Sequence, residues 1–225
     1  MIGDLKLNDV PAVEVVSFDM DGTLTGGRFT DLVWSEGITR LYSLRKKIPL
    51  DQAKKCVFEE YARLGEGRKE WYDIKYWFRL FDLGEDWSGL LKSLEHEIMT
   101  FSEVPAVLEL LGKEHQLVVT SNASREFTDI ELEACGVRAY FMNVFSATSD
   151  FGEVKKTPDV YLKVCQLLAV KPEQVAHVGD HYTFDFAVPR QLGIHAFYLD
   201  RQGKEQGDFV VHDLAEFSQR IRSCQ

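Results

Sequence analysis

The stretch that decides the fold runs from Val15 to Thr25 and reads Val-Val-Ser-Phe-Asp-Met-Asp-Gly-Thr-Leu-Thr. A short apolar run ends there in two carboxylates, Asp19 and Asp21, which are two positions apart. Side chains alternate along a strand, so residues at this spacing point to the same side, where like charges repel. Another part of the chain must therefore supply a partner that makes this pair tolerable.

The composition predicts a globular chain with a sizeable core. With 225 residues, 45% of them hydrophobic and 12% aromatic, the chain is long enough for one large domain or for a domain with an insertion. The formal net charge of −10 argues against nucleic acid or an anionic membrane as the main partner. It leaves a small anionic substrate open, because a metal or a local cluster of donors overrides the global charge.

The sequence also gives an expectation of compartment. No apolar run is long enough to span a bilayer, and the first residues lack a signal-peptide pattern. The four cysteines are scattered without a Cys-x-x-Cys pair, and they are Cys56, Cys135, Cys165 and Cys224. We therefore expect reduced thiols in a cytoplasmic protein.

Short apolar segments alternate with helix patterns over most of the chain. Segments that read as buried strands are 13–18, 117–120, 175–178 and 196–199, with a weaker one at 140–145. Helices are expected to start near Ser102, at Ser124 with an end at Gly136, and at Thr157 with an end near Leu168. This alternation predicts an α/β fold with a doubly wound parallel sheet.

Residues 31–99 differ from the rest, because they show four helical stretches and no convincing strand. The second and fourth stretches are expected to be capped by Asp51 and Asp86. Their apolar and aromatic stripes favour the core of a helical bundle over a cofactor site. We therefore predict a catalytic core of residues 1–27 and 101–225, with an inserted α-helical bundle, the cap, at 28–100.

Polar residues follow the predicted strands, where a parallel sheet places its ligand site. They are Asp19, Asp21, Thr23, Ser121, Asn122, Lys155, Lys156, Asp180 and Asp185. Each alone has an ordinary explanation as a cap, a turn former or a solvated charge. That explanation does not account for so many complementary groups converging on one edge of one sheet.

Phosphoryl transfer accounts for this set. Clustered carboxylates suit a hard cation such as Mg²⁺, which neutralises them and polarises a phosphoryl oxygen. One carboxylate can then attack phosphorus while the second protonates the leaving oxygen. A hydroxyl and a lysine hold the remaining phosphoryl oxygens, and positioning with charge neutralisation is most of what this reaction needs.

Four ordered motifs resemble those of the haloacid dehalogenase superfamily. They are Asp19-Met20-Asp21-Gly22-Thr23-Leu24, Ser121-Asn122, Lys155, and Gly179-Asp180 with Asp185. The resemblance covers the whole chain, including a helical cap inserted between the first and second motifs. It implies a Rossmann-like core and an aspartyl-phosphate intermediate.

The resemblance also implies roles for the acidic residues. Asp19 would be the nucleophile and a metal ligand. Asp21 would be the general acid and then the base for water, with its backbone carbonyl on Mg²⁺. Asp180 would be a further metal ligand, and Asp185 would support the metal site.

The remaining motif residues would bind the phosphoryl group. Ser121 and Asn122 would contact it, Thr23 would orient the first loop, and Lys155 would stabilise the group and orient Asp19. Family members with this type of cap usually have proline directly after the lysine, whereas Lys156 follows Lys155 here. We choose Lys155 on its spacing from Gly152, and Lys156 is the alternative.

Two other positions depart from the family pattern. His181 follows Asp180 where small polar residues are more common, and both contact with substrate and a bystander role remain open for it. Pro189 falls inside the helix expected after Asp185, so that helix should be short or kinked.

Several reactions share this catalytic core. We expect a Mg²⁺-dependent phosphatase that acts on a small phosphorylated metabolite, as a monomer or homodimer. A sugar-phosphate mutase is the alternative. Asp21 argues against a 2-haloacid dehalogenase, which lacks the second aspartate, and the retained Asp19 and Asp21 argue against a non-enzymatic sensor.

Substrate choice is expected to lie in the cap. The turn at 64–68 stands where related caps project a specificity loop, and there Arg68, with Arg63 as a second candidate, would meet another anionic group of the substrate. An exposed charged turn is the ordinary alternative. The glycines of 25–27 suit a hinge through which the cap opens and closes.

Overall fold

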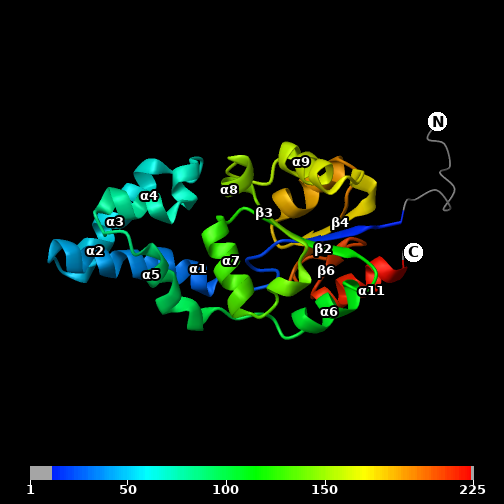
Figure 1. Ribbon diagram of the computed structural model, residues 1–225, viewed down its shortest axis with the longest axis horizontal. Helices are drawn as coiled ribbons and strands as arrows, with labels where there is room; N and C mark the ends of the chain where they lie inside the picture. Colours follow the sequence, from blue (N-terminus) through cyan, green and yellow to red (C-terminus); the bar gives the residue numbers. More distant parts are fainter. Residues whose placement is uncertain (1–11, 224–225) are drawn as a thin grey trace.

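The computed structural model describes residues 12–223, which form a parallel sheet with helices on both faces and a helical part beside it (Figure 1). The six strands lie in the order β3-β2-β1-β4-β5-β6, and all neighbouring pairs are parallel. They are β1 Val15–Phe18, β2 Gln116–Ser121, β3 Asn143–Ser146, β4 Val175–Gly179, β5 His195–Leu199 and β6 Val210–Val211. The prediction of an α/β doubly wound sheet is confirmed, and the two-residue strand β6 is an addition to it.

The central strand β1 is buried along its whole length because the sheet is covered on both faces. Val15 belongs to the cluster on one face, and Val16 and Phe18 belong to the cluster on the other. Helices α6 and α11 contribute to the cluster of Phe18, whereas α9 contributes to that of Val15. The chain therefore leaves the carboxyl end of β1 at the middle of a two-sided core.

The helices of the sheet layer include the three whose starts were predicted, which begin directly after Glu103, Ser124 and Thr157. The helices of this layer are α6 Val104–Leu111, α7 Arg125–Ala134, α8 Ala147–Phe151, α9 Pro158–Leu168, α10 Val188–Gln191 and α11 Leu214–Ser223. Short turns of 3-10 helix are η4 Arg138–Tyr140 and η5 Pro172–Gln174, and a π-helical turn is η6 Tyr182–Ala187. The helix around Pro189 is short, as predicted. It is α10, which has four residues and directly follows the π turn η6.

The helical part lies between β1 and α6 in the chain and occupies one side of the molecule (Figure 1). Its elements are α1 Arg28–Leu32, the π turn η1 Val33–Gly37, α2 Ile38–Lys46, α3 Leu50–Leu64, η2 Lys69–Tyr72, α4 Ile74–Phe81, α5 Trp87–Leu94 and η3 Glu95–Glu97. Its core is aromatic, with Trp77 buried against Tyr61 and Phe81 at ring distances of 4.6 and 5.5 Å. The aromatic stripes are thus packing residues of a helical bundle.

Two helix starts in this part were predicted from aspartates, and one prediction is wrong. Asp86 caps α5, because its carboxylate accepts a hydrogen bond of 2.8 Å from the backbone N–H of Gly89. Asp51 does not cap α3, since the residue before that helix is Pro49 and Asp51 lies in the first turn. An acid in the first turn still interacts favourably with the helix dipole, so the residue fits this place as well.

The two chain crossings between the sheet and the helical part are paired with each other. Thr25 bridges Thr100 in an antiparallel arrangement, and the N–H of Gly26 donates to the carbonyl of Met99 at 3.0 Å. The hydroxyl of Thr100 donates to the carbonyl of Leu24 at 2.8 Å. Both crossings therefore leave the sheet at one place, directly after the Asp19–Asp21 loop.

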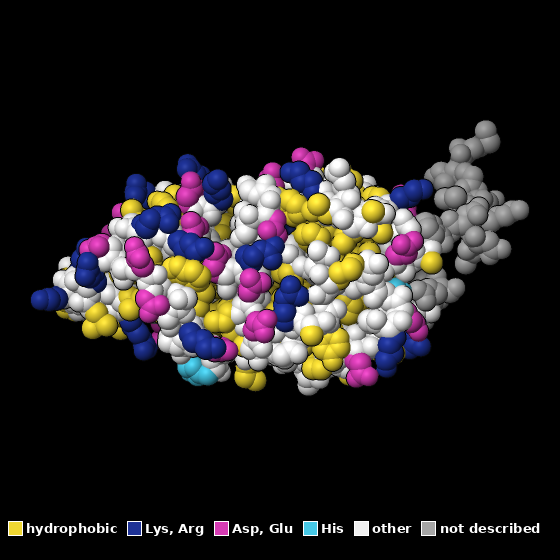
Figure 2. Space-filling model, in the orientation of Figure 1, with side chains coloured by type: hydrophobic (Ala, Val, Ile, Leu, Met, Phe, Trp, Pro, Cys, Tyr) yellow, Lys and Arg dark blue, Asp and Glu magenta, His cyan; other side chains and the backbone are white. Residues whose placement is uncertain are grey.

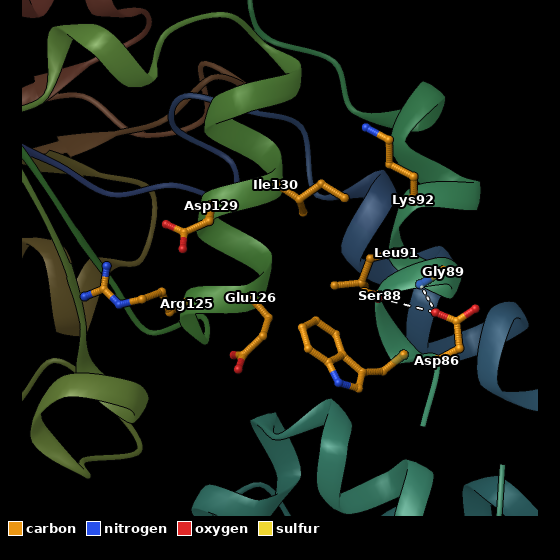
Figure 3. Close-up of a pocket in the computed structure, with 10 residues that line it drawn as sticks. Asp86, Ser88, Gly89, Leu91, Lys92, Arg125, Glu126, Asp129 and Ile130 are labelled. Atoms are coloured by element: carbon orange, nitrogen blue, oxygen red, sulfur yellow. Dashed lines mark hydrogen bonds between the residues drawn. The ribbon is translucent and has the colours of Figure 1, made fainter. Parts of the chain in front are cut away.

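The helical part also packs on α7 of the sheet layer. Trp34 stacks on Phe127 with ring centroids 5.2 Å apart, and Lys75 forms an ion pair with Glu126. A groove of about 680 Å³ lies between α5 and α7, where Leu91 and Ile130 point toward each other (Figure 3). This groove shares no lining residue with the cavity that holds Asp19.

The surface carries charges of both signs, and the described cysteines are free. On the face drawn in Figure 2, basic and acidic side chains are interspersed over the molecule. Across residues 12–223 we find no helix with both the length and the apolar character needed to cross a membrane. Cys56, Cys135 and Cys165 are free thiols, and Cys224 lies outside the described residues.

The core of the helical part can be tested with a matched pair of leucines. Leu91 on α5 is 2% exposed and Leu44 on α2 is 75% exposed. We expect Leu91→Ala to lower the free energy of unfolding by about 2–5 kcal/mol, because it leaves a cavity, and Leu44→Ala to change it by less than about 0.5 kcal/mol. Urea unfolding followed by tryptophan fluorescence measures both, and equal effects would contradict the assigned packing.

Candidate active site

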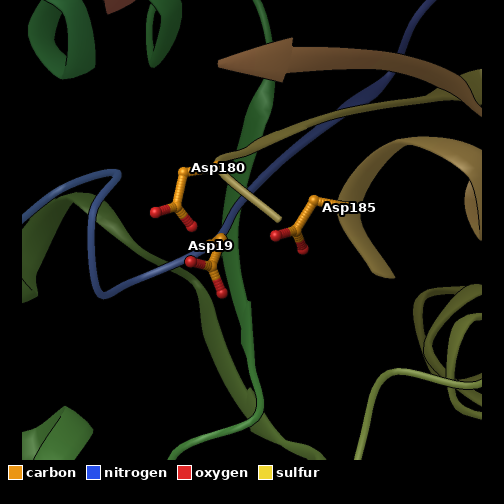
Figure 4. A group of neighbouring side chains, drawn as sticks. All are labelled: Asp19, Asp180 and Asp185. Atoms are coloured by element: carbon orange, nitrogen blue, oxygen red, sulfur yellow. The ribbon is translucent and has the colours of Figure 1, made fainter. Parts of the chain in front are cut away.

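Three carboxylates converge at the carboxyl edge of the sheet (Figure 4). Asp19 directly follows β1, Asp180 directly follows β4, and Asp185 lies on η6. One oxygen from each lies within 4.8 Å of those of the other two, and Asp19 and Asp185 are buried whereas Asp180 is exposed. Oxygen donors of this kind fit a hard divalent cation. The expectation that polar residues after parallel strands share one edge of the sheet thus holds for residues that are 166 positions apart in the chain, from 19 to 185.

Two glycines make this close approach feasible. Gly22 has a φ of +78°, and a Cβ added there would lie 2.1 Å from Oδ2 of Asp180. A Cβ at Gly179 would lie 2.4 Å from the carboxyl carbon of Asp185. Any larger residue at either position would displace one of the clustered acids.

The partner of Asp19 is Lys156, so the prediction that Lys155 orients Asp19 is wrong. The Lys156 side chain is completely buried, and its ammonium forms ion pairs with both Asp19 and Asp185. It also donates to the carbonyl of Thr120 at 3.1 Å. The ammonium of Lys155 lies instead over the rings of Tyr72 and Phe184, at 5.0 and 5.8 Å from their centroids. Spacing along the chain did not reveal which of two adjacent lysines points inward.

Burial and neighbouring charges shift the pKa values of Asp19, Asp185 and Lys156. Burial raises the pKa of Asp19 well above its ordinary value, and the negative charges of Asp185 and Asp180 raise it further. The ammonium of Lys156 lowers this pKa but does not offset the burial. Burial also acts to raise the pKa of Asp185, but Lys156 and His177 hold it below its ordinary value. Burial acts to lower the pKa of Lys156, and the two carboxylates more than offset this and raise it. A bound cation would further favour the ionised form of Asp19.

Asp21 stands apart from the three clustered acids. Its Oδ1 accepts a hydrogen bond of 3.1 Å from the hydroxyl of Thr30, and burial raises its pKa to about 6. Burial, together with the charge of Asp185, also raises the pKa of Asp180 to about 6. Asp21 can thus hold a proton near neutral pH, and it lies outside the three clustered carboxylates.

The other predicted residues lie around the same point. The Oγ of Ser121 accepts from the N–H of Ala123 at 3.1 Å, which leaves its own hydroxyl proton to donate. The side-chain oxygen of Asn122 accepts from the backbone N–H of Lys156 at 2.7 Å, and this bond fixes the second motif to the third. The hydroxyl of Thr23 lies 3.5 Å from Oδ2 of Asp19.

A cavity of about 290 Å³ opens over these groups. Sheet-edge residues and aromatic residues from both parts of the chain line it, and they are Asp19, Asp21, Thr30, Trp34, Trp71, Tyr72, Ser121, Asn122, Ala123, Ser124, Phe127, Asp180, His181 and Asp185. Arg68 is not among them, because it is exposed and pairs with Glu70, and Arg63 pairs with Glu60. The expectation that Arg68 meets the substrate therefore finds no support in its position.

Several residues that hold the site were missed from the sequence. Arg201 donates to the backbone carbonyls of Gly22 and Thr23 at 3.1 and 2.7 Å, and it pairs with Glu103. Its signal was available, because Asp200-Arg201 follows β5 as the other site residues follow their strands. Nε2 of His177 lies 3.1 Å from Asp185, and its signal was a histidine inside an otherwise apolar strand.

The chain belongs to the haloacid dehalogenase-like hydrolase family, whose model matches residues 13–193. It is 31% identical to N-acylneuraminate-9-phosphatase of Rattus norvegicus over 123 residues, which are 54% of this chain and 49% of that protein. The chain thus spans about half the length of this curated relative.

Two solved structures show how widely the fold is shared. A phosphatase of the family from Thermococcus onnurineus matches with a TM-score of 0.77 and 23% identity, covering 92% of this chain and 97% of that one. A 2-haloacid dehalogenase from Pseudomonas syringae pv. Tomato DC3000 matches with a TM-score of 0.72 and 23% identity, covering 95% and 100%. Because structures named for different reactions match almost equally, the fold alone does not choose the reaction.

The two lysines give a direct test of the buried ion pairs. Lys156→Met leaves two buried carboxylates without their cation, so we expect the free energy of unfolding to fall by about 3–5 kcal/mol. Lys155→Met removes a partly exposed cation–π contact and should cost less than about 1 kcal/mol. Urea unfolding of both variants near neutral pH, without divalent cations, measures the difference, and the reverse order would contradict the assignment of Lys156.

Proposed function

We propose that this protein is a Mg²⁺-dependent phosphatase that hydrolyses a small phosphorylated metabolite. The observation that carries the proposal is the division of labour within one loop. Asp19 lies against the buried ammonium of Lys156, whereas Asp21 accepts a hydroxyl hydrogen bond and faces the same cavity. Lys156 together with a bound cation would keep Asp19 ionised as a nucleophile, and Asp21 would carry a proton.

The reaction takes place in two steps on these residues. A carboxylate oxygen of Asp19 attacks phosphorus and forms an aspartyl phosphate, and the P–O bond to the leaving group breaks as Asp21 gives its proton to the leaving oxygen. Asp21 then takes a proton from water, which attacks phosphorus and releases phosphate and free Asp19. The hydroxyl of Ser121 would hold a phosphoryl oxygen in both steps, and Lys156 would hold Asp19 in position.

The donor set supports a Mg²⁺ ion held by Asp19 and Asp180, with Asp185 supporting the site and the backbone carbonyl of Asp21 as a further ligand. When bound, the ion neutralises the carboxylates and polarises a phosphoryl oxygen. The three clustered carboxyl oxygens are the observation that fits it, since two of these acids are buried and one opens to solvent.

The helical part fits the role of a cap. We propose that residues 28–100 form a cap domain that moves on a core of residues 1–27 and 101–225, through the paired crossings at Thr25 and Thr100. Closure would exclude water during the first step. The free thiols Cys56, Cys135 and Cys165 favour a reducing compartment such as the cytoplasm.

Asp21 distinguishes this proposal from carbon–halogen hydrolysis. An attack on carbon expels a halide, which leaves without a proton, so that reaction has no use for a second acid beside the nucleophile. We therefore expect no halide release from 2-chloropropionate under conditions in which phosphate esters are hydrolysed.

The nucleophile and the metal can be tested together. We expect the purified protein to hydrolyse an aryl phosphate. The rate should fall by at least about 100-fold when Mg²⁺ is removed with a chelator, and by the same factor in Asp19→Asn. The rate of phosphate release measures each of these results. Exposed Asp208→Asn is the matched control and should retain the wild-type rate. Activity that ignores the metal or survives the Asp19 substitution would contradict the aspartyl-phosphate mechanism.

The cavity lining makes a second prediction, about the leaving group. None of the residues that line the cavity is Lys or Arg, and the helical part contributes Trp34, Trp71 and Tyr72 to it. An alcohol that carries a neutral ring should therefore be favoured, because it stacks on these side chains, over one that carries a second anion.

The measurement is kcat/KM for phenyl phosphate, a ribose phosphate, glycerol phosphate and phosphoglycolate. We expect the ring esters to exceed phosphoglycolate by about tenfold or more, and Trp71→Leu to reduce that preference. Trp87→Leu, in the groove between α5 and α7, is the control. A preference for phosphoglycolate would show that the second anion is recognised after all.

A further inference from the structure

Glu131 is a buried acid that the reaction described above does not use. It lies on α7 with 1% of its surface exposed, and no ion pair joins it to a cation among residues 12–223. Its carboxyl group instead contacts two hydroxyls, those of Thr25 at 2.6 Å and Thr30 at 3.4 Å. An unpaired carboxylate at this depth would be costly, so the group needs another explanation.

Counting protons along this chain of contacts shows which atom donates to which. Thr30 has one hydroxyl proton, yet its oxygen lies 3.1 Å from Oδ1 of Asp21 and 3.4 Å from Oε1 of Glu131. If Thr30 donates along the shorter contact to Asp21, the contact with Glu131 needs a proton on Glu131. Thr25 then donates to the other oxygen, Oε2, so each group in the chain has a partner.

A neutral Glu131 agrees with its surroundings. Burial raises the pKa of this carboxyl well above its ordinary value, and the negative charge of Asp21 raises it further whenever Asp21 is ionised. The hydrogen bond accepted from Thr25 acts in the other direction, but it does not offset the burial. The order of donation is therefore Thr25 to Glu131, Glu131 to Thr30, and Thr30 to Asp21.

We propose that Glu131 is a positioning residue that, through the Thr30 hydroxyl, orients Asp21 as the general acid. With Oδ1 of Asp21 accepting from Thr30, the proton of the carboxyl group sits on Oδ2. This is the oxygen left to face the leaving group in the cavity. The inference rests on the proposed phosphatase function, and it adds a residue that the four motifs do not contain.

The same contacts tie the acid to the position of the helical part. Thr30 lies on α1, Thr25 lies at the paired crossings, and Glu131 lies on α7 of the sheet layer. Asp21 and Glu131 are therefore joined through a residue of the helical part.

The choice of leaving group separates this role from a purely structural one. An alkyl phosphate needs a proton on its leaving oxygen, whereas the p-nitrophenolate ion leaves without one. Misplacing Asp21 should therefore slow the first step with glycerol phosphate and leave that step nearly unchanged with p-nitrophenyl phosphate. The second step is common to both esters, so the comparison uses kcat/KM, which reports the first step. Damage to the fold or to the metal site would slow both.

The experiment compares the wild type with Glu131→Gln, Glu131→Met and the exposed Glu133→Met on both esters in Mg²⁺, with the melting temperature of each recorded. Glutamine can still donate to Thr30 and accept from Thr25, so Glu131→Gln should stay within about threefold of the wild type. In Glu131→Met we expect kcat/KM for glycerol phosphate to fall by about 30-fold or more and kcat/KM for p-nitrophenyl phosphate by less than threefold. Glu133→Met should match the wild type.

Several outcomes would overturn the inference. They are an equal loss on both esters in a folded Glu131→Met, no loss on either, or a loss in Glu131→Gln as large as in Glu131→Met. Should Glu131→Met not fold, Thr30→Val removes only the bridging hydroxyl and must show the same selective loss. A wild type that releases phosphate from neither ester would overturn the proposed function itself, and Asp19→Asn identifies that case by matching it.

Discussion

The buried ammonium of Lys156 is the interaction on which the site depends. Parallel strands bring Asp19, Asp180 and Asp185 to one edge of the sheet, and two of these acids are buried. Like charges this close destabilise one another unless a cation lies between them. Lys156 supplies one positive charge to Asp19 and Asp185, and the remaining negative charge is what makes the cluster suited to a divalent metal.

The loop after β1 is held from several directions. Arg201 donates to the carbonyls of Gly22 and Thr23 from the loop after β5, and Lys156 fixes Asp19 from the third motif. Thr30 reaches Asp21 from the helical part. Asp19 is thus fixed by the sheet layer, whereas Asp21 is fixed by an element on the other side of the crossings. The two acids are therefore held by different parts of the molecule.

Much of the fold and part of the site followed from local sequence patterns. The short apolar runs at β1, β2, β4 and β5 predicted buried strands, and the polar residues that follow parallel strands then placed Asp19, Asp180 and Asp185 together. The weaker strand β3 was also found, but β6 is too short for any periodicity to reveal it. Asp51 was misread because an acid in the first turn of a helix resembles a cap in sequence.

The site residues that were missed share one physical property, which is that long-range contacts define them. Glu131 stands in a charged helix, and nothing nearby in the sequence shows that it faces Thr25 and Thr30. Arg68 stood at a suitable turn, but its guanidinium pairs with Glu70 on the surface. Local patterns report burial and secondary structure, whereas the partner of a side chain depends on segments that are distant in the chain.

The sequence alone determined the α/β class, the helical insertion and the order of the carboxylates, because periodicity and strand-end chemistry are local properties. The tertiary structure decided which lysine neutralises Asp19, because adjacent residues point in different directions and only packing shows which one is buried. It also decided that Asp21 shares a hydrogen-bonded chain with Glu131, since that chain joins three elements that meet only in the folded protein.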